Sequence, residues 1–186
     1  MSQSIFDFPL DKAREIADKY IELLRPYCTR IEIAGSVRRE KSIVHDIEIV
    51  AVPVIETNLD MFGNVASSRN VLDTAANDLA ASMGAVLRKN GPKFKQFGLA
   101  EGLNLDLFLV TPPAHWGVIY LIRTGSADFS HRAVMTKRQG GMLPSWAKVE
   151  DGQIKHRETG EVYPCPEEQD YFNLCDINFV NPKERI

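Results

Sequence analysis

Apolar and polar positions follow two different periods along this chain, and the period changes at turn residues. Residues 10–24 and 71–83 place apolar side chains at three- and four-residue spacings, which predicts two amphipathic helices. Shorter segments show period-two alternation or continuous apolar runs, which predicts strands. The order of these elements predicts a mixed sheet with helices behind it, an α+β fold. The predicted strands are residues 30–34, 46–53, 85–88, 94–99 and 103–110.

The pattern changes after residue 111, where Pro112 and Pro113 interrupt the chain. Two short helical patterns, two predicted hairpin turns and a last short helix at residues 167–174 follow. We therefore expect a domain over residues 1–111 and a smaller lobe over residues 112–186. Within the first domain, residues 53–69 show no clear period.

Composition and charge exclude several classes of protein. A chain of 186 residues that is 44% hydrophobic can bury a substantial core. It has no apolar run of the roughly 20 residues that a membrane span needs, and residues 1–9 lack the pattern of a secretion signal. We expect a cytoplasmic protein, nuclear in a nucleated host, neither secreted nor bound to a membrane. Three cysteines and four histidines lack the spacing of a disulfide framework or a zinc site.

The net charge of -3 argues against bulk electrostatic coating of nucleic acid. Locally, residues 123–138 hold four Lys or Arg against one Asp, whereas residues 145–186 hold five against nine Asp or Glu. This contrast fits a protein face that binds a polyanion, and it also fits two helix faces that are simply exposed to solvent.

Three acids interrupt strands that are otherwise apolar. Asp46 and Glu48 share one face of a predicted strand, and Asp106 lies in the middle of another. Unpaired charge is costly there. Oxygen ligands without cysteine or histidine favour magnesium or manganese, and two such ions about 4 Å apart can bind the attacking and leaving oxygens of a phosphoryl transfer. Ion pairs with Arg38 or Arg39 would also explain the acids.

A Gly35-Ser36 turn follows the strand at residues 30–34 and precedes residues that can open a helix. The free N–H groups of a helix start attract an anion, glycine allows a phosphate to approach, and the serine hydroxyl can donate. The turn lies about ten residues before the paired acids, so a triphosphate and metals could meet there.

These residues resemble family X DNA polymerases, the polymerase beta-like nucleotidyltransferases. Residues 33–39 (IAGSVRR) and 46–49 (DIEI) resemble the family's G-S-x-R-R … D-x-D signature, and Asp106 is similar to its third carboxylate. Residues 117–126 resemble the G-V-L-Y-F-T-G-S segment, and residues 170–185 are like the closing D-I-F … E-P-K-x-R. The resemblance covers nearly the whole chain and is weakest between residues 53 and 89.

The resemblance implies a palm over residues 1–111 and a thumb-like lobe over residues 112–186. It implies that Asp46 and Glu48 bind two Mg²⁺ ions, for which Mn²⁺ can substitute, and that Asp106 binds the catalytic ion and helps deprotonate a 3′-hydroxyl. The implied reaction adds dNMP from dNTP to a DNA primer end and releases pyrophosphate, in DNA repair or replication, by a monomer.

The resemblance also implies binding residues. Ser36 and Arg39 would hold the triphosphate, Thr124 and Gly125 would line the sugar, and Arg132 would face the template-side minor groove. The expected nucleotide-binding residues are Gly35, Ser36, Arg39, His45, Arg123, Thr124, Gly125 and Ser126. The expected DNA-binding residues are Lys93, Lys95, Arg132, Lys137 and Arg138.

Several positions depart from the family pattern. The chain begins at the helix before the palm, so we expect a minimal form without the lyase and helix-hairpin-helix domains. Glu48 replaces the usual Asp, and His45 stands where a Ser-Gly pair normally helps to bind phosphate, so it can substitute as a donor. Ile122 and Arg123 replace an aromatic pair, and Ala127 stands where an acid usually contacts the base.

Three functions remain open at this stage. The first is a DNA polymerase or terminal transferase that uses dNTP or NTP. The second is a nucleotidyltransferase that modifies RNA ends, a protein or a small molecule. The third is an inactive nucleotide- or DNA-binding module, against which the three acids count. The basic residues after Thr124 favour DNA.

Overall fold

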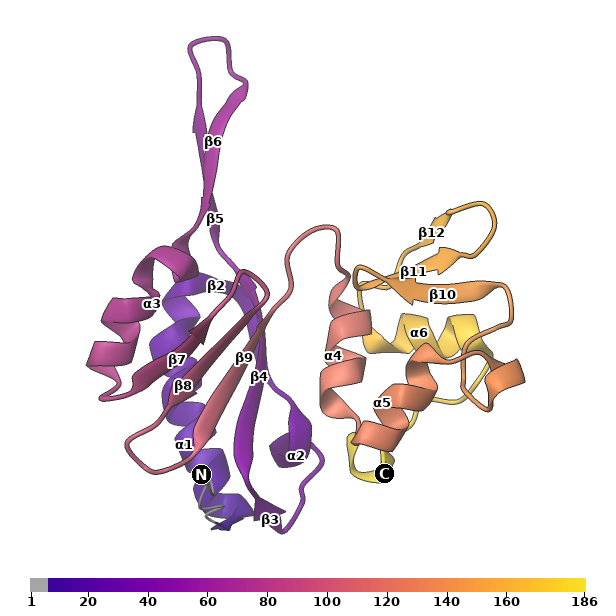
Figure 1. Ribbon diagram of the computed structural model, residues 1–186, viewed down its shortest axis with the longest axis horizontal. Coiled ribbons are helices and arrows are strands. Elements are labelled where there is room, and N and C mark those ends of the chain that lie inside the picture. The colour runs from indigo at the N-terminus through magenta and orange to yellow at the C-terminus, as the bar shows by residue number, and fades with distance from the viewer. Residues whose placement is uncertain (1–6) are drawn as a thin grey trace. The chain divides into compact units, whose positions relative to one another are not determined.

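The computed structural model describes residues 7–186, which form two compact units (Figure 1). The first unit takes the described residues up to Ile33 together with Ser42–Leu109, and the second takes Ala34–Lys41 with Val110–Ile186. The division after Leu109 lies close to the boundary expected after residue 111. It differs in residues 34–41, which pack with the second unit although they precede the acid-bearing strand. Residues 1–6, part of the stretch without a secretion signal pattern, lie outside the described residues.

A five-stranded sheet forms the first unit, in the order β2-β4-β9-β8-β7. Strands β4 and β9 are parallel and the other neighbours are antiparallel, so the sheet is mixed and the predicted fold class is confirmed. Its strands are β2 (Cys28–Ile33), β4 (Asp46–Pro53), β7 (Val86–Asn90), β8 (Phe94–Gly98) and β9 (Asn104–Leu109). A short pair, β1 (Phe8–Pro9) and β3 (Ile43–Val44), accompanies the sheet.

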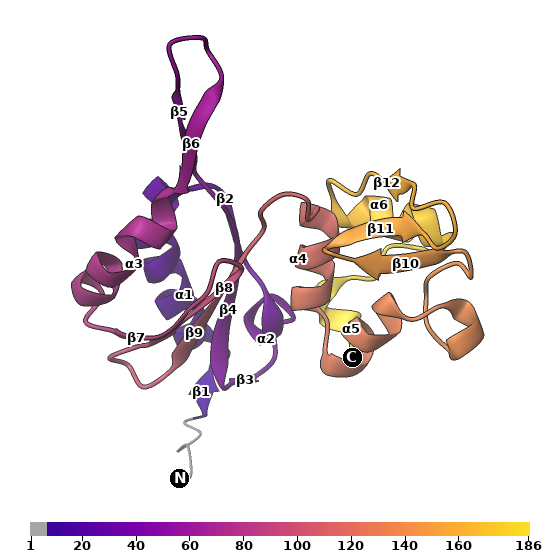
Figure 2. The same cartoon turned by 45° about the horizontal axis from the view of Figure 1, so that its top comes forward.

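Helices α1 (Leu10–Leu24) and α3 (Val71–Ser82) cover one face of this sheet (Figure 2). Their apolar stripes pack on fully buried strand residues that include Ile47, Ile49 and Leu105. Alternation along β4 and β9 therefore sends the residues between these positions to the opposite face. Helix α1 ends at Leu24 as expected, and Pro26 lies within the 3₁₀ turn at Arg25–Tyr27 that follows it.

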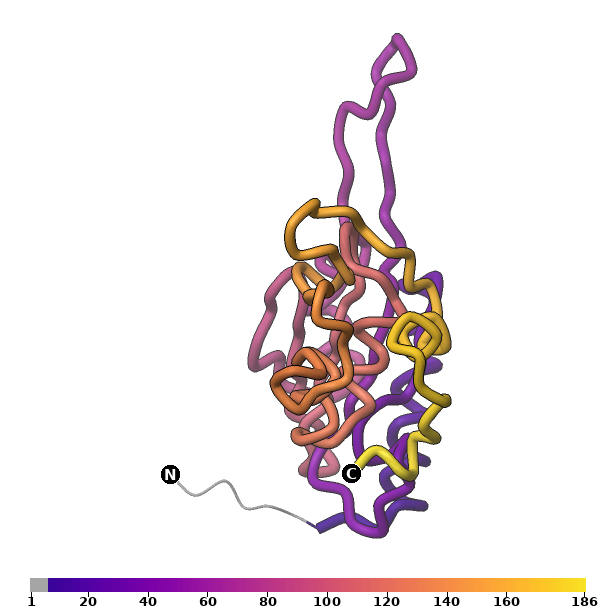
Figure 3. Tube along the Cα trace, turned by 90° about the vertical axis from the view of Figure 1, so that its right-hand side faces the viewer, coloured from indigo at the N-terminus to yellow at the C-terminus, as the bar shows by residue number. Residues whose placement is uncertain are grey.

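A two-stranded ribbon, β5 (Ile55–Leu59) and β6 (Val65–Asn70), projects from the first unit (Figure 3). The sequence showed no period here because nearly every side chain of the ribbon is exposed, so no buried face imposes an alternation. In its turn, the Asp60 carboxylate accepts hydrogen bonds from the backbone N–H groups of Phe62 and Asn64, at 2.8 and 2.9 Å.

The second unit combines helices with a small antiparallel sheet around its own core. The short helices and hairpin turns expected after residue 111 are present. The helices are α2 (Gly35–Arg38), α4 (Trp116–Thr124), α5 (Ala127–Val134) and α6 (Glu168–Cys175), and the strands are β10 (Ala147–Glu150), β11 (Gln153–His156) and β12 (Val162–Tyr163). Short 3₁₀ helices lie at Lys137–Gln139 and Pro182–Glu184. Across residues 7–186, no helix has the length and apolar character to cross a membrane.

Candidate active site

The pairing of β4 with β9 brings the three acids to one face of the sheet. Glu48 lies directly opposite Asp106, and Asp46 lies opposite Asn104. Neighbouring strands are about 4.8 Å apart, so the carboxylates of Glu48 and Asp106 stand side by side. All three acids are half-buried, on the face that α1 and α3 leave uncovered. The strand register therefore adds Asp106 to the face that the sequence predicted for Asp46 and Glu48.

Gln96 is a functional candidate that the sequence reasoning missed. It lies opposite Asp106 on β8, and its Nε2 donates to Asp106 Oδ1 at 2.8 Å. This bond orients the Asp106 carboxylate on the sheet face. The sequence signal for Gln96 was the period-two alternation along β8. It puts Gln96 on the same face as Phe94 and Gly98, which is the acid-bearing face.

The acid-bearing face has the donor chemistry of a hard-cation site. Its three carboxylates supply only oxygen atoms, which divalent magnesium and manganese prefer. In their present orientations, no three His, Cys, Asp or Glu side chains of residues 7–186 converge as ligands of one ion. The three carboxylates therefore supply the oxygen donors that a hard cation prefers, but the described residues do not arrange them as the ligands of one ion.

In the second unit, the Gly35-Ser36 turn opens α2. Gly35 has a φ of 57°, a backbone conformation that glycine adopts readily. The Ser36 hydroxyl oxygen is buried and, among residues 7–186, has no hydrogen-bond partner. Because buried hydroxyl groups normally find a partner, this orphaned donor fits a ligand with acceptor oxygens, such as a phosphate.

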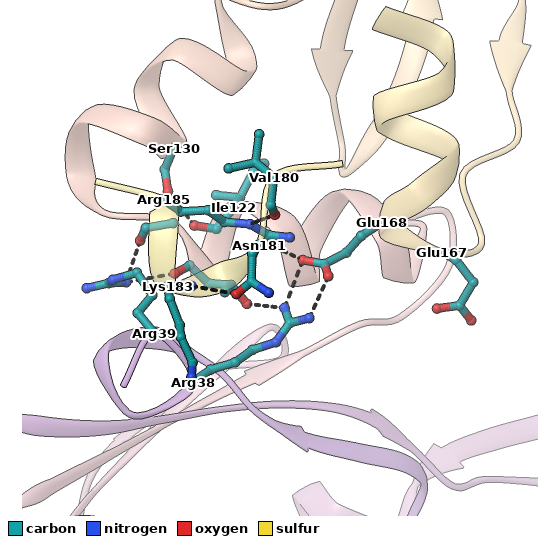
Figure 4. Close-up of polar contacts among 12 residues, drawn as sticks. Arg38, Arg39, Ile122, Ser130, Glu167, Glu168, Val180, Asn181, Lys183 and Arg185 are labelled. Carbon is teal, nitrogen blue, oxygen red and sulfur yellow. Dashed lines mark hydrogen bonds and ion pairs between the residues drawn. The ribbon is translucent and has the colours of Figure 1, made fainter. Parts of the chain in front are cut away.

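Arg38 lies in a buried ion-pair network of the second unit (Figure 4). Its guanidinium donates to both oxygens of Glu168, at 2.8 and 2.6 Å, and to the Thr124 hydroxyl at 2.6 Å. Arg185, whose side chain is fully buried, donates to Glu168 at 2.5 Å. Burial opposes ionisation of the Glu168 carboxyl, but the hydrogen bonds from both arginines outweigh it and hold its pKa below the ordinary value. The network anchors α2 on α4 and α6.

The Arg39 side chain forms hydrogen bonds to the backbone of the segment between α4 and α5. Its Nη1 donates to the carbonyl oxygens of Thr124 and Gly125, at 2.7 and 2.8 Å. Thr124 is fully buried, so its hydroxyl and carbonyl both serve the two arginines rather than facing solvent. The Ser126 hydroxyl accepts from the Phe129 N–H at 3.1 Å and caps α5.

The sequence did not reveal the ion pairs of Glu168 with Arg38 and Arg185, because these residues are distant from one another in the chain. In the sequence, Glu168 is one acid in the first turn of a predicted helix. Acids at this position stabilise many helices and need no further role.

The remaining predicted binding residues are exposed. His45 belongs to the first unit, with its Nδ1 3.3 Å from an Asp7 carboxylate oxygen. In the second unit, Lys137 donates to the Cys175 carbonyl at 2.7 Å, which restrains its ammonium group. The other exposed residues of these predicted sets are Lys93, Arg123, Arg132 and Arg138.

Lys95 requires a correction. Its side chain is 1% exposed, and its ammonium lies 2.5 Å from the Asp73 carboxylate of α3 and contacts Asn90. Lys95 follows Phe94 on β8, so alternation turns it toward the helices and away from the acid-bearing face. A charge that is buried and already paired cannot serve as the DNA phosphate contact expected from the sequence.

Comparisons with known proteins were made at the levels of sequence and structure. No protein-family model and no curated protein matches the sequence. Among solved structures, a polymerase beta from Leishmania infantum, described as a ternary P/T complex, superposes with a TM-score of 0.71 at 13% sequence identity. The match covers 97% of this chain and 77% of that one. The chain therefore has a polymerase beta-like fold.

Proposed function

We propose that this protein is a DNA nucleotidyltransferase that transfers dNMP from dNTP to a 3′-hydroxyl and releases pyrophosphate. The observation that carries the proposal is the row of Asp46, Glu48 and Asp106 on one face of β4 and β9. Like charges gathered at one place are typical of functional sites. The polymerase beta-like fold supports the same reaction class.

Each acid has a role in this proposal. Asp46 and Glu48 would hold two Mg²⁺ ions, and Asp106 would share one of them. When bound, the ions would stabilise negative charge on the attacking and leaving oxygens. Asp106, oriented by Gln96, would accept the proton of the 3′-hydroxyl. The bond from the 3′ oxygen to the α-phosphorus then forms as the bond to pyrophosphate breaks.

Ser36 supplies a binding role in the second unit. Its orphaned hydroxyl would donate to a phosphate oxygen of the nucleotide, and Gly35 leaves room for that oxygen because it has no side chain. The network around Glu168 holds α2 in place, so Arg38 has a positioning role and is not itself a phosphate ligand in this proposal.

The test is primer extension on single-stranded, gapped and blunt DNA, with each dNTP and NTP, in magnesium and then in manganese. Asp106→Ala is expected to lower transfer by at least about 100-fold, because it removes both a metal ligand and the proton acceptor. Nucleotide binding should stay close to that of the parent, since Asp46 and Glu48 remain. Asp78→Ala, which removes an exposed acid of α3, is the matched control. Activity of Asp106→Ala within tenfold of the parent would contradict the assignment.

A further inference from the structure

Strand β7 contains a bulge that places two basic residues on the acid-bearing face. The register with β8 shifts between Leu87 and Lys89, so Arg88 is an extra residue in the strand. Lys89 lies opposite Gln96, whose side chain reaches Asp106 on that face. Bulges commonly redirect side chains beside active sites. In a regular strand, one of two consecutive residues would face the core instead.

Gly98 creates the space that Arg88 occupies. A Cβ at this glycine would lie 2.5 Å from Arg88 Nε, so a larger residue would displace the guanidinium. Through this gap, Arg88 Nη1 crosses β8 and donates to Asn104 Oδ1 at 2.7 Å. Asn104 lies opposite Asp46. The guanidinium is therefore held at Asn104, which lies two residues before Asp106 on β9.

Lys89 adds a second positive charge to this face. Its ammonium lies 5.4 Å from the centre of the Phe94 ring, which stacks on Phe108. Across residues 7–186, neither Arg88 nor Lys89 forms an ion pair with a carboxylate, and the Arg88 guanidinium makes one hydrogen bond. Since arginine has five N–H donors, most of them remain directed to solvent.

The placement of the pair indicates what it binds. Two unpaired cations beside a row of carboxylates attract an anion whose other part approaches the acids. A polynucleotide carries a backbone phosphate beside each sugar, so a strand whose 3′ end lies at the acids also presents a phosphate to these two cations. Resting on the proposed function, we propose that Arg88 and Lys89 bind a backbone phosphate near the 3′ end of the acceptor strand.

Binding can be measured without turnover. A labelled single-stranded oligonucleotide is titrated by fluorescence anisotropy in EDTA over a series of salt concentrations. Replacing both residues, Arg88→Gln with Lys89→Gln, should raise Kd at low salt by about tenfold or more. It should also reduce the slope of log K against log salt by about 0.7, as the loss of one phosphate contact to a single strand predicts. Lys12→Gln, on the helix-covered side, is the charge control.

Gly98→Ala tests the geometry without changing a charge. It should displace Arg88 from Asn104 and weaken binding in the same direction, with an unchanged unfolding midpoint. In primer extension, both variants should raise KM for the acceptor while KM for dNTP stays constant. Binding equal to that of Lys12→Gln, or a loss of nucleotide affinity instead, would overturn the proposal. Absence of transfer by the parent would instead refute the proposed function, and the anisotropy result would still decide on Arg88 and Lys89.

Discussion

Replacing Glu168 with glutamine should destabilise the second unit strongly. The carboxylate is 6% exposed and forms ion pairs with both Arg38 and Arg185. In Glu168→Gln, the amide can accept from one arginine but presents N–H groups to the other. Arg185 is fully buried and cannot move its charge to solvent.

The expected cost follows from this loss of charge balance. Removing one partner of a buried ion pair typically destabilises a protein by about 3–5 kcal/mol. Because one carboxylate serves two arginines here, we expect the upper part of that range. A domain is commonly stable by only about 5–15 kcal/mol, so the variant would lose a large share of the stability of this unit.

Urea unfolding followed by tryptophan fluorescence measures this unit selectively, because the two tryptophans, Trp116 and Trp146, both belong to it. Glu184→Gln is the matched control, since Glu184 is exposed and neighbours Arg185 in sequence. If the free energy of unfolding of Glu168→Gln differs from that of the parent by less than about 1 kcal/mol, the scale of an exposed ion pair, the reasoning is refuted.

The same network predicts a pH dependence. The folded-state pKa of Glu168 is lowered, so its contribution to stability is complete above the unfolded pKa of about 4.3. The contribution disappears as the pH falls through the lowered folded-state pKa. The stability difference between the parent and Glu168→Gln should therefore be constant near neutral pH and shrink below about pH 4.

Three further predictions concern the second unit. Gly117→Ala should destabilise it by about 1–3 kcal/mol in the same urea assay, because a Cβ there would lie 2.2 Å from the Glu167 carbonyl oxygen and force α4 away from α6. Tyr171→Phe should cost about 1–3 kcal/mol, since its buried hydroxyl donates to the Ala133 carbonyl at 2.7 Å; an unchanged midpoint would contradict this. If the proposed function holds, the ratio of kcat/KM for dATP to kcat/KM for ATP should be less than about 10³, because the exposed Arg123 can donate to a 2′-hydroxyl. This ratio should be larger in Arg123→Phe.

The sequence by itself determined the elements whose side chains repeat with a period. Helix α1 begins and ends at the residues that its apolar stripe predicted, because one face must be buried. Period-two alternation placed Asp46 and Glu48 on one face of β4 before any partner strand was known. The β5–β6 ribbon could not be found in this way, because an element with no buried face leaves no period in the sequence.

Tertiary structure decided which distant residues meet. The parallel register of β4 and β9 places Asp106 opposite Glu48, and no local pattern encodes that register. The bulge in β7 turns Arg88 toward the acids, while Lys95 is buried against Asp73 although it looks equally basic in the sequence. Charge alone cannot distinguish such residues, since their roles follow from the face and the partner that strand pairing assigns to them.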